Sequence, residues 1–164
     1  MTKTRKHKVM PVEAIERIIA AMPQPPKVEH NPAEAFYSIG LDTVSVPPAN
    51  QFDSAEEYYS TLFHELVHST GHDSRLQRPS LSRIAQGSDH LYSYEELVAE
   101  MGAAMLCGLT GIAPKTIDNS AAYIANWLQS LRDNPDYVIY AGAAAQKACR
   151  YIKGERNRAR KSNR

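Results

Sequence analysis

The chain has 164 residues, of which 43% are hydrophobic and 23% charged, and its formal net charge is +1. This length suits one domain with its own core, and the ordinary apolar fraction argues against intrinsic disorder. No apolar stretch is long enough to span a bilayer, and no secretory signal follows the basic N-terminus. The two cysteines, Cys107 and Cys149, lie far apart in alanine-rich sequence and fit reduced thiols. We therefore expect a cytoplasmic protein without membrane contact.

The small net charge conceals a segregation of charge along the chain. Residues 1–10 hold four basic side chains and no acidic one, and residues 150–164 hold seven basic and one acidic. The remainder, residues 11–149, holds 8 basic against 17 acidic side chains. Basic tails can contact nucleic acid, but neither tail has the interleaved aromatic residues that favour such binding. We expect mainly solvated tails with weak nucleic-acid contact at most.

The first fifty residues predict one helix and one hairpin. Residues 11–22 place isoleucines on one face of a short amphipathic helix, which Pro23 ends. Two β-prone runs then flank the turn residues 40–42. This pattern predicts a β-hairpin over residues 35–46.

A second helix is predicted by its capping residues. Ser54 and Glu57, three positions apart, form a capping box. The helix should begin at about residue 55 and end at Gly71, where glycine allows a left-handed cap. The polar residues 72–92 show little periodicity, and a loop of this length indicates a functional segment.

The C-terminal half predicts three further helices. We expect them over residues 93–108, over residues 117–132, and from an N-cap at Asn134 with Pro135 in the first turn to about Ile152. The fold class is therefore α+β, mainly helical, with a small antiparallel sheet before the second helix.

The motif HELVH, from His64 to His68, lies in the middle of the second predicted helix. Residues four apart project from the same side of a helix, so both imidazoles can bind one tetrahedral Zn²⁺. Glu65 then stands beside the metal, where it can take a proton from bound water. The alternative is a pair of surface histidines around a solvated glutamate, but the capped helix and its apolar neighbours favour the metal site.

A third protein ligand is required, and the metzincin pattern does not supply it. That pattern demands a histidine at position 74, where this chain has Ser74. His72 stands at the wrong offset, and we expect it to interact with the C-terminal end of the second helix instead.

The third helix offers a better ligand. Glu96 and Glu100 share one face of an otherwise apolar helix, where unpaired acids are unfavourable. We assign Glu96 as the third ligand, and Glu100 as the acceptor of the other ring N–H of a ligand histidine. Glu95 remains an alternative ligand. An exposed acidic stripe is the competing interpretation, but the small residues 102–104 indicate close helix packing.

Several other residues have weaker signals. Arg75 and Arg78 are expected to form ion pairs rather than to bind substrate, and Cys107 to fill the core. A second donor to the developing oxyanion is expected, and the sequence does not choose among the candidates Tyr92, Tyr94, Tyr123 and His90. Tyr123 and Trp127 have a spacing more typical of core residues.

Four motifs occur in order: HELVHSTGH at 64–72, RLQR at 75–78, EELVAE at 95–100 and AYIANWL at 122–128. With an upstream segment from Phe36 to Phe52, they resemble the zincin-like metallopeptidase domain of ArdC-type antirestriction proteins, which plasmids and phages carry. The resemblance covers about residues 30–153. It implies a zincin fold, the zinc ligands His64, His68 and Glu96, and Glu65 as general base.

We divide the chain accordingly into residues 1–29, a tail with a short helix; residues 30–153, the metallopeptidase domain; and residues 154–164, a basic tail. Members of the family often carry an N-terminal single-stranded-DNA-binding domain, for which the residues before the matched region leave no room. DNA binding is therefore not carried over.

Two functional hypotheses follow. The first is a zinc-dependent peptidase that acts on a protein or peptide substrate, with Glu65 as general base. The second is a non-proteolytic, zinc-containing module that binds DNA or a host protein in antirestriction. Two histidines and one carboxylate leave a coordination position open, as catalytic zinc sites do, and so favour the peptidase.

Overall fold

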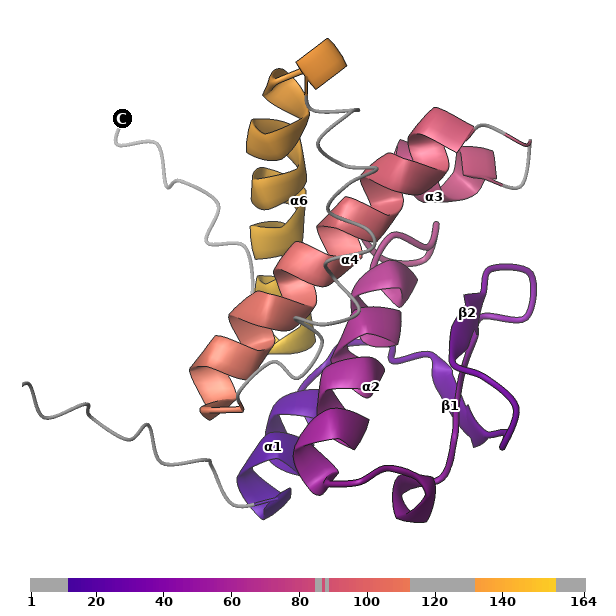
Figure 1. Cartoon of the computed structure of the whole chain (residues 1–164), viewed down its shortest axis with the longest axis vertical. Helices are drawn as coiled ribbons and strands as arrows, with labels where there is room; N and C mark the ends of the chain where they lie inside the picture. Colours follow the sequence, from indigo (N-terminus) through magenta and orange to yellow (C-terminus); the bar gives the residue numbers. More distant parts are fainter. Residues whose placement is uncertain (1–11, 85–86, 88, 113–131, 156–164) are drawn as a thin grey trace, which may run out of the picture.

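A computed structural model describes residues 12–84, 87, 89–112 and 132–155. Its elements are α1 (Val12–Ala20), β1 (Lys27–His30), β2 (Phe36–Ser38), β3 (Thr43–Val46), a 3₁₀ turn (Ala49–Gln51), α2 (Ala55–Ser69), α3 (Pro79–Ile84), α4 (Asp89–Thr110) and α6 (Asp136–Ile152). Helix α4 packs between α2 and α6, and the small sheet lies on the other side of α2 (Figure 1). The expected α+β, mainly helical fold class is confirmed.

The sheet has three strands in the order β1-β3-β2. Strands β2 and β3 form the predicted hairpin, with Phe36 opposite Ser45 in an antiparallel register. The parallel strand β1, which pairs with β3, was not predicted, so the sheet is mixed rather than wholly antiparallel. All four residues of β1 are exposed, so no buried alternation marks this strand in the sequence. Central strand β3 is buried throughout and supports the hairpin.

Helix α2 begins where its capping residues predict. The Ser54 hydroxyl accepts a hydrogen bond from the Glu57 N–H at 3.2 Å, and the Glu57 carboxylate accepts one from the Asp53 N–H at 3.2 Å. The predicted left-handed cap at Gly71 is wrong, since the described glycines with positive φ are at other positions. A Cβ at Gly71 would lie 2.9 Å from Cζ of Arg78, so glycine is required there for the passage of this side chain.

The expected loop over residues 72–92 is partly helical. It contains α3 and the first turn of α4, which begins four residues earlier than predicted. Helix α6 ends at the predicted Ile152, but Pro135 rather than Asn134 occupies its N-cap position. The helix predicted over residues 117–132 lies almost entirely outside the described residues.

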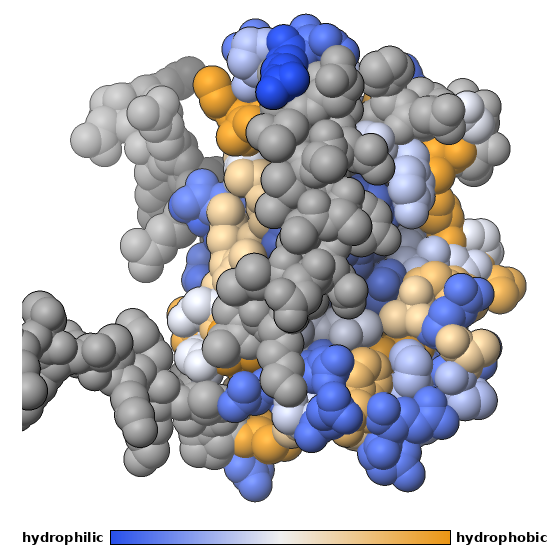
Figure 2. Space-filling view, in the orientation of Figure 1, coloured by the Kyte–Doolittle hydropathy of each residue, from blue (hydrophilic) through white to orange (hydrophobic). Residues whose placement is uncertain are grey.

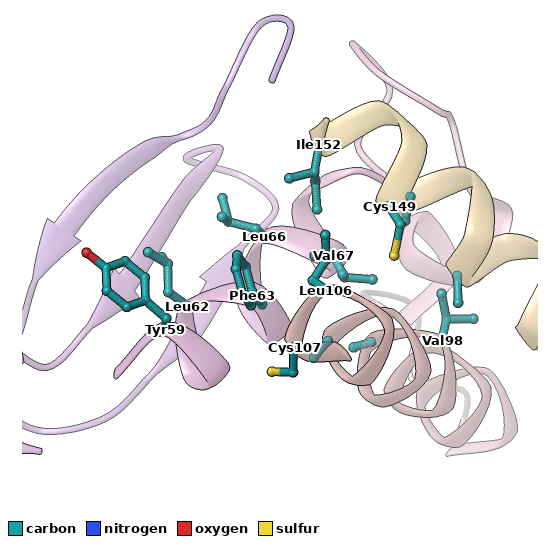
Figure 3. Packing of buried hydrophobic residues seen from close by; sticks show 14 of the residues in the cluster. Tyr59, Leu62, Phe63, Leu66, Val67, Val98, Leu106, Cys107, Cys149 and Ile152 are labelled. Carbon is teal, nitrogen blue, oxygen red and sulfur yellow. The ribbon is translucent and has the colours of Figure 1, made fainter. Parts of the chain in front are cut away.

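The core lies between α2, α4 and α6 and extends to the sheet. Figure 3 shows its buried side chains, among them Phe63, Leu66, Val67, Val98, Leu106 and Ile152. Helices α2 and α4 approach so closely that a Cβ at Gly102 would lie 2.7 Å from Cγ2 of Val67. The expected close packing of the small residues is thus confirmed at position 102. Cys107 and Cys149 are both buried free thiols in this core.

Helix α1 joins the same core through Ile15, and the Tyr59 hydroxyl donates a hydrogen bond to Glu16 at 2.5 Å.

On the face in Figure 2, the apolar residues outside the grey atoms form separate groups among hydrophilic ones. Across the part of the chain that the structure describes, none of the helices has the length and apolar character needed to cross a bilayer.

Candidate metal centre

Helices α2 and α4 bring three side chains together. His64 and His68 stand one turn apart on α2, and their Nε2 atoms are 3.1 Å apart. Glu96 projects from α4 between them, with Oε2 3.3 Å from Nε2 of His64 and Oε1 3.1 Å from Nε2 of His68. The geometry therefore gathers two imidazoles and one carboxylate around a single point.

These distances fit a bound divalent cation. Tetrahedral ligands that are each 2.0–2.1 Å from zinc lie roughly 3.3 Å from one another, close to the separations found here. The outer ring nitrogens also support this fit, because Nδ1 of each histidine faces a carboxylate. With a proton on each Nδ1, two Nε2 lone pairs face each other at 3.1 Å, and only a shared cation or proton relieves their repulsion.

Two further glutamates hold the outer side of the imidazoles. Glu100 Oε1 lies 3.4 Å from Nδ1 of His64, the kind of contact expected of this residue. Glu95 Oε1 lies 3.4 Å from Nδ1 of His68. Glu95 therefore faces the ring from the side opposite Nε2, and Glu96 is the carboxylate that faces both Nε2 atoms.

Glu95 is fully buried and is surrounded by donors that the sequence did not reveal. Arg78 binds both its carboxylate oxygens, with Nε 2.9 Å from Oε2, and the Ser80 hydroxyl donates to Oε2 at 2.6 Å. The ion pairs expected of both arginines are present, since Arg75 pairs with Asp42. The only sequence signal for the Glu95 contact was the presence of a basic residue near the metal motif.

The electrostatics of the cluster favour positive charge between the imidazoles. Burial lowers the pKa of His68, but hydrogen bonds with Glu95 and Glu96 outweigh burial and raise it to about 10. Burial raises the pKa of Glu96, but its contacts with the two imidazoles outweigh this and hold it well below its usual range. The surroundings of the two Nε2 atoms thus favour a cation between them.

Glu65 has a different environment from Glu96. It is 7% exposed, and burial raises the pKa of its carboxyl although both imidazoles oppose the shift. A carboxylate with a raised pKa is a stronger base, which suits proton transfer near neutral pH.

Glu65 lines a cavity of about 290 Å³ that also opens onto His64, His68 and Glu96. The walls are formed by apolar and aromatic side chains from β2 and its flanks, from α3 and from the start of α4: Ala35, Phe36, Tyr37, Ile39, Leu81, Ile84 and Tyr92. The cavity therefore combines a polar floor with a largely apolar wall, as small-molecule and peptide sites do.

The candidate oxyanion donors and His72 lie in different parts of the structure. Tyr92 lines the cavity, whereas Tyr94 packs edge-on against Tyr137 of α6 at 5.7 Å between ring centroids. His72 Nδ1 lies 2.8 Å from the Ser74 hydroxyl and accepts from the Ser74 N–H, so its contact is local. Tyr123 and Trp127 lie outside the described residues, as does the side chain of His90.

One wall of the cavity is held by a second polar network. The Tyr37 hydroxyl donates to Asp42 at 2.7 Å, and Asp42 pairs with Arg75. Arg75 also donates from Nε to the Ser69 carbonyl at 2.7 Å, and from Nη1 to the Gln24 carbonyl at 2.9 Å. This network ties the hairpin turn to the C-terminal end of α2.

Comparison with known proteins agrees with this geometry. A family model described as zincin-like metallopeptidase matches residues 13–146. The chain is 37% identical over 137 residues to the DNA primase TraC of Escherichia coli, and 28% identical over 151 residues to the protein y4eC of Sinorhizobium fredii. The crystal structure of the Mn(II)-bound antirestriction protein ArdC from plasmid R388 matches with a TM-score of 0.74 and 34% sequence identity.

These relatives are longer proteins. The matches cover 83%, 92% and 95% of this chain but only 12% of TraC, 48% of y4eC and 57% of the ArdC chain. The chain thus corresponds to one part of each relative. On the family match and the site geometry together, the chain belongs to the zincin-like metallopeptidase family.

Proposed function

We propose that this domain is a metal-dependent peptidase from a mobile genetic element, related to antirestriction. The observation that carries the proposal is the convergence of His64, His68 and Glu96 beside a cavity that Glu65 also lines. The similar ArdC structure, which is that of an antirestriction protein from a plasmid, supports the mobile-element and antirestriction setting. The substrate is then a protein or peptide in the cytoplasm.

The ligand set favours Zn²⁺ as the resident metal. Two imidazoles and one carboxylate are the protein ligands of many catalytic zinc sites, whereas Mn²⁺ prefers oxygen ligands. The solved ArdC structure is Mn(II)-bound, which supports a divalent cation in this chain as well. When bound, such an ion polarises the scissile carbonyl and lowers the pKa of a bound water.

The residues of the chain supply the remaining steps. Glu65 removes a proton from the attacking water and delivers it to the leaving amine, a role that its raised pKa suits. Among the candidate oxyanion donors whose side chains the structure describes, Tyr92 lines the same cavity and can donate a hydrogen bond to the developing oxyanion. Strand β2 is at the edge of the sheet and contributes Phe36 and Tyr37 to the cavity wall, so it can align an extended peptide by strand addition.

The cavity wall also indicates a preference among substrates. Its side chains above the metal ligands are apolar or aromatic, so a charged residue placed there would lose hydration without a partner. We expect cleavage beside apolar residues.

The test is digestion of an unbiased peptide library by the Zn²⁺-loaded protein, with Glu65→Gln as the decisive variant. Glu65→Gln should keep its zinc and lose roughly 10²- to 10⁴-fold in cleavage rate, because it lacks the base. Glu56→Gln, on the same helix but outside the cavity lining, is the matched control and should retain activity. Equal cleavage by Glu65→Gln and the native protein would refute Glu65 as the general base. No cleavage by the Zn²⁺-loaded native protein would refute the peptidase and leave the non-proteolytic module, which binds DNA or a host protein.

A further inference from the structure

Glu95 is the most enclosed charged group beside the metal centre. Its side chain has no exposed surface, whereas those of Glu96 and Glu100 are 15% and 20% exposed. A carboxylate in such a place is strongly unfavourable unless donors surround it. Those donors are present, as Arg78, Ser80 and Nδ1 of His68 all face its two oxygens.

Arg78 connects this carboxylate to the end of helix α2. Its Nη2 donates to the carbonyls of Val67 at 3.0 Å and His68 at 3.3 Å, and its Nη1 donates to the Thr70 hydroxyl at 2.9 Å. The same guanidinium binds Glu95 through Nε and Nη2. Arg78 therefore holds the backbone of His68 directly and contacts the ring of His68 through Glu95.

Space for this guanidinium is created by Gly71, since a Cβ there would lie 2.9 Å from both Cζ and Nη2 of Arg78. A buried ion pair is seldom the most stabilising choice, because apolar residues of similar size often give equal or greater stability. The buried pair of Arg78 and Glu95 is better explained by its effect on the orientation of the His68 ring than by its contribution to the stability of the fold.

We propose that Arg78 and Glu95 are positioning residues for the metal ligand His68. Arg78 fixes the Glu95 carboxylate, and Glu95 takes the Nδ1–H of His68, which leaves Nε2 as a lone pair aimed at the site shared with His64 and Glu96. The inference rests on the metal binding in the proposed function, but not on peptidase activity.

The test measures Zn²⁺ affinity by competition with a chromophoric chelator. Glu95→Gln keeps the size of the side chain and removes its charge, so affinity should fall roughly 10- to 100-fold. Asp42→Asn is the matched control, because Asp42 also pairs with an arginine but binds Arg75 and Tyr37 rather than an imidazole of the site. Its zinc affinity should stay within about twofold of the native value.

A double-mutant cycle tests whether Arg78 acts through Glu95. Arg78→Lys keeps the charge but loses the planar set of donors, and its affinity should also fall. In the variant that combines Arg78→Lys with Glu95→Gln, the loss should be clearly smaller than the product of the two single losses. Independent, multiplicative losses would overturn the role of Arg78 as a residue that acts through Glu95.

A role in folding alone predicts a different result. Circular dichroism of the metal-free variants gives the folded fraction, and a folding role lowers the apparent affinity only in proportion to that fraction. Ser80→Ala removes one hydrogen bond from Glu95 and serves as a milder variant, expected to lose a few-fold in affinity if Glu95→Gln does not fold. Unchanged affinity in folded Glu95→Gln or in Ser80→Ala would refute the positioning role.

The outcome is separable from that of the peptidase test. A native protein that binds Zn²⁺ tightly but cleaves no peptide would end the proposed function and leave the positioning role intact. Conversely, a peptidase whose zinc affinity does not depend on Glu95 would end only the inference made here.

Discussion

Two arginines three residues apart, Arg75 and Arg78, each pair with a carboxylate brought from a distant element. Both guanidinium side chains are almost fully buried, at 1% and 9% exposure. Their partners differ, because Glu95 has no exposed surface whereas the side chain of Asp42 is 34% exposed. We therefore expect the exposure of the carboxylate, more than that of the arginine, to decide how much stability is lost when such a pair is broken.

The two pairs also support different parts of the site. The Arg78 pair contacts His68, a candidate metal ligand, whereas the Arg75 pair contacts Tyr37 on the wall of the cavity. We therefore expect changes in the first pair to affect metal binding and changes in the second to affect the hairpin.

The largest effect is expected from Arg78→Met. This change leaves the Glu95 carboxylate buried without its arginine partner, and breaking a buried pair in this way costs about 3–5 kcal/mol. Urea denaturation of the metal-free protein measures the loss. A smaller loss in the free energy of unfolding than that of Arg75→Met would contradict the expectation that the exposure of the carboxylate decides the loss.

Arg75→Met should have a smaller effect on stability, about 1.5–3 kcal/mol, because water can hydrate the partly exposed Asp42 once its partner is gone. The Ser69 carbonyl also loses a donor, so part of the loss arises at the end of α2. The same urea experiment measures it, and zinc affinity should remain close to that of the native protein.

The pH dependence of stability provides a third test. Hydrogen bonds from Arg75 hold the pKa of Asp42 below its usual value, although burial opposes this. Because the folded-state pKa is the lower one, the stabilisation is complete above the unfolded-state pKa and is lost as pH falls towards the folded-state pKa. The stability difference between the native protein and Asp42→Asn should therefore shrink from pH 5 to pH 3. A difference that is independent of pH would show that the ionised carboxylate contributes nothing.

The smallest effect is expected from Tyr37→Phe. This change removes the hydroxyl that donates to Asp42 and accepts from Arg75 at 3.2 Å, at a net cost of about 0.5–1.5 kcal/mol, and keeps the aromatic ring on the cavity wall. Thermal unfolding at neutral pH measures the change. If peptide cleavage fell sharply while stability changed little, the Tyr37 hydroxyl would act on the substrate rather than on the hairpin.

Local signals in the sequence were sufficient for much of the fold. The capping residues Ser54 and Glu57 predicted the start of α2, and the turn before Thr43 predicted the hairpin. Strand β1 could not be predicted, because its residues are exposed and its order depends on pairing with β3 more than ten residues away. The sequence predicted a left-handed helix cap at Gly71 because the contact that requires glycine there, with the side chain of Arg78, forms only in the folded structure.

Helical periodicity brought together much of the candidate site. The spacing of His64 and His68, and that of Glu96 and Glu100, predicted which side chains share a face, and α2 and α4 place these faces together. The arrangement around Glu95 could not be predicted, because periodicity does not reveal which arginine lies against a buried acid.

Position 102 has a consequence for any attempt to transplant this centre into another scaffold. Helices α2 and α4 carry the imidazoles and the carboxylate, and they meet where Gly102 lies against Val67. A single methyl group added at position 102 would lie 2.7 Å from Cγ2 of Val67, so the side chain of Val67 or the two helices would have to shift. A design that transplants this centre must therefore keep glycine at position 102, six residues beyond Glu96, as well as the metal-binding residues.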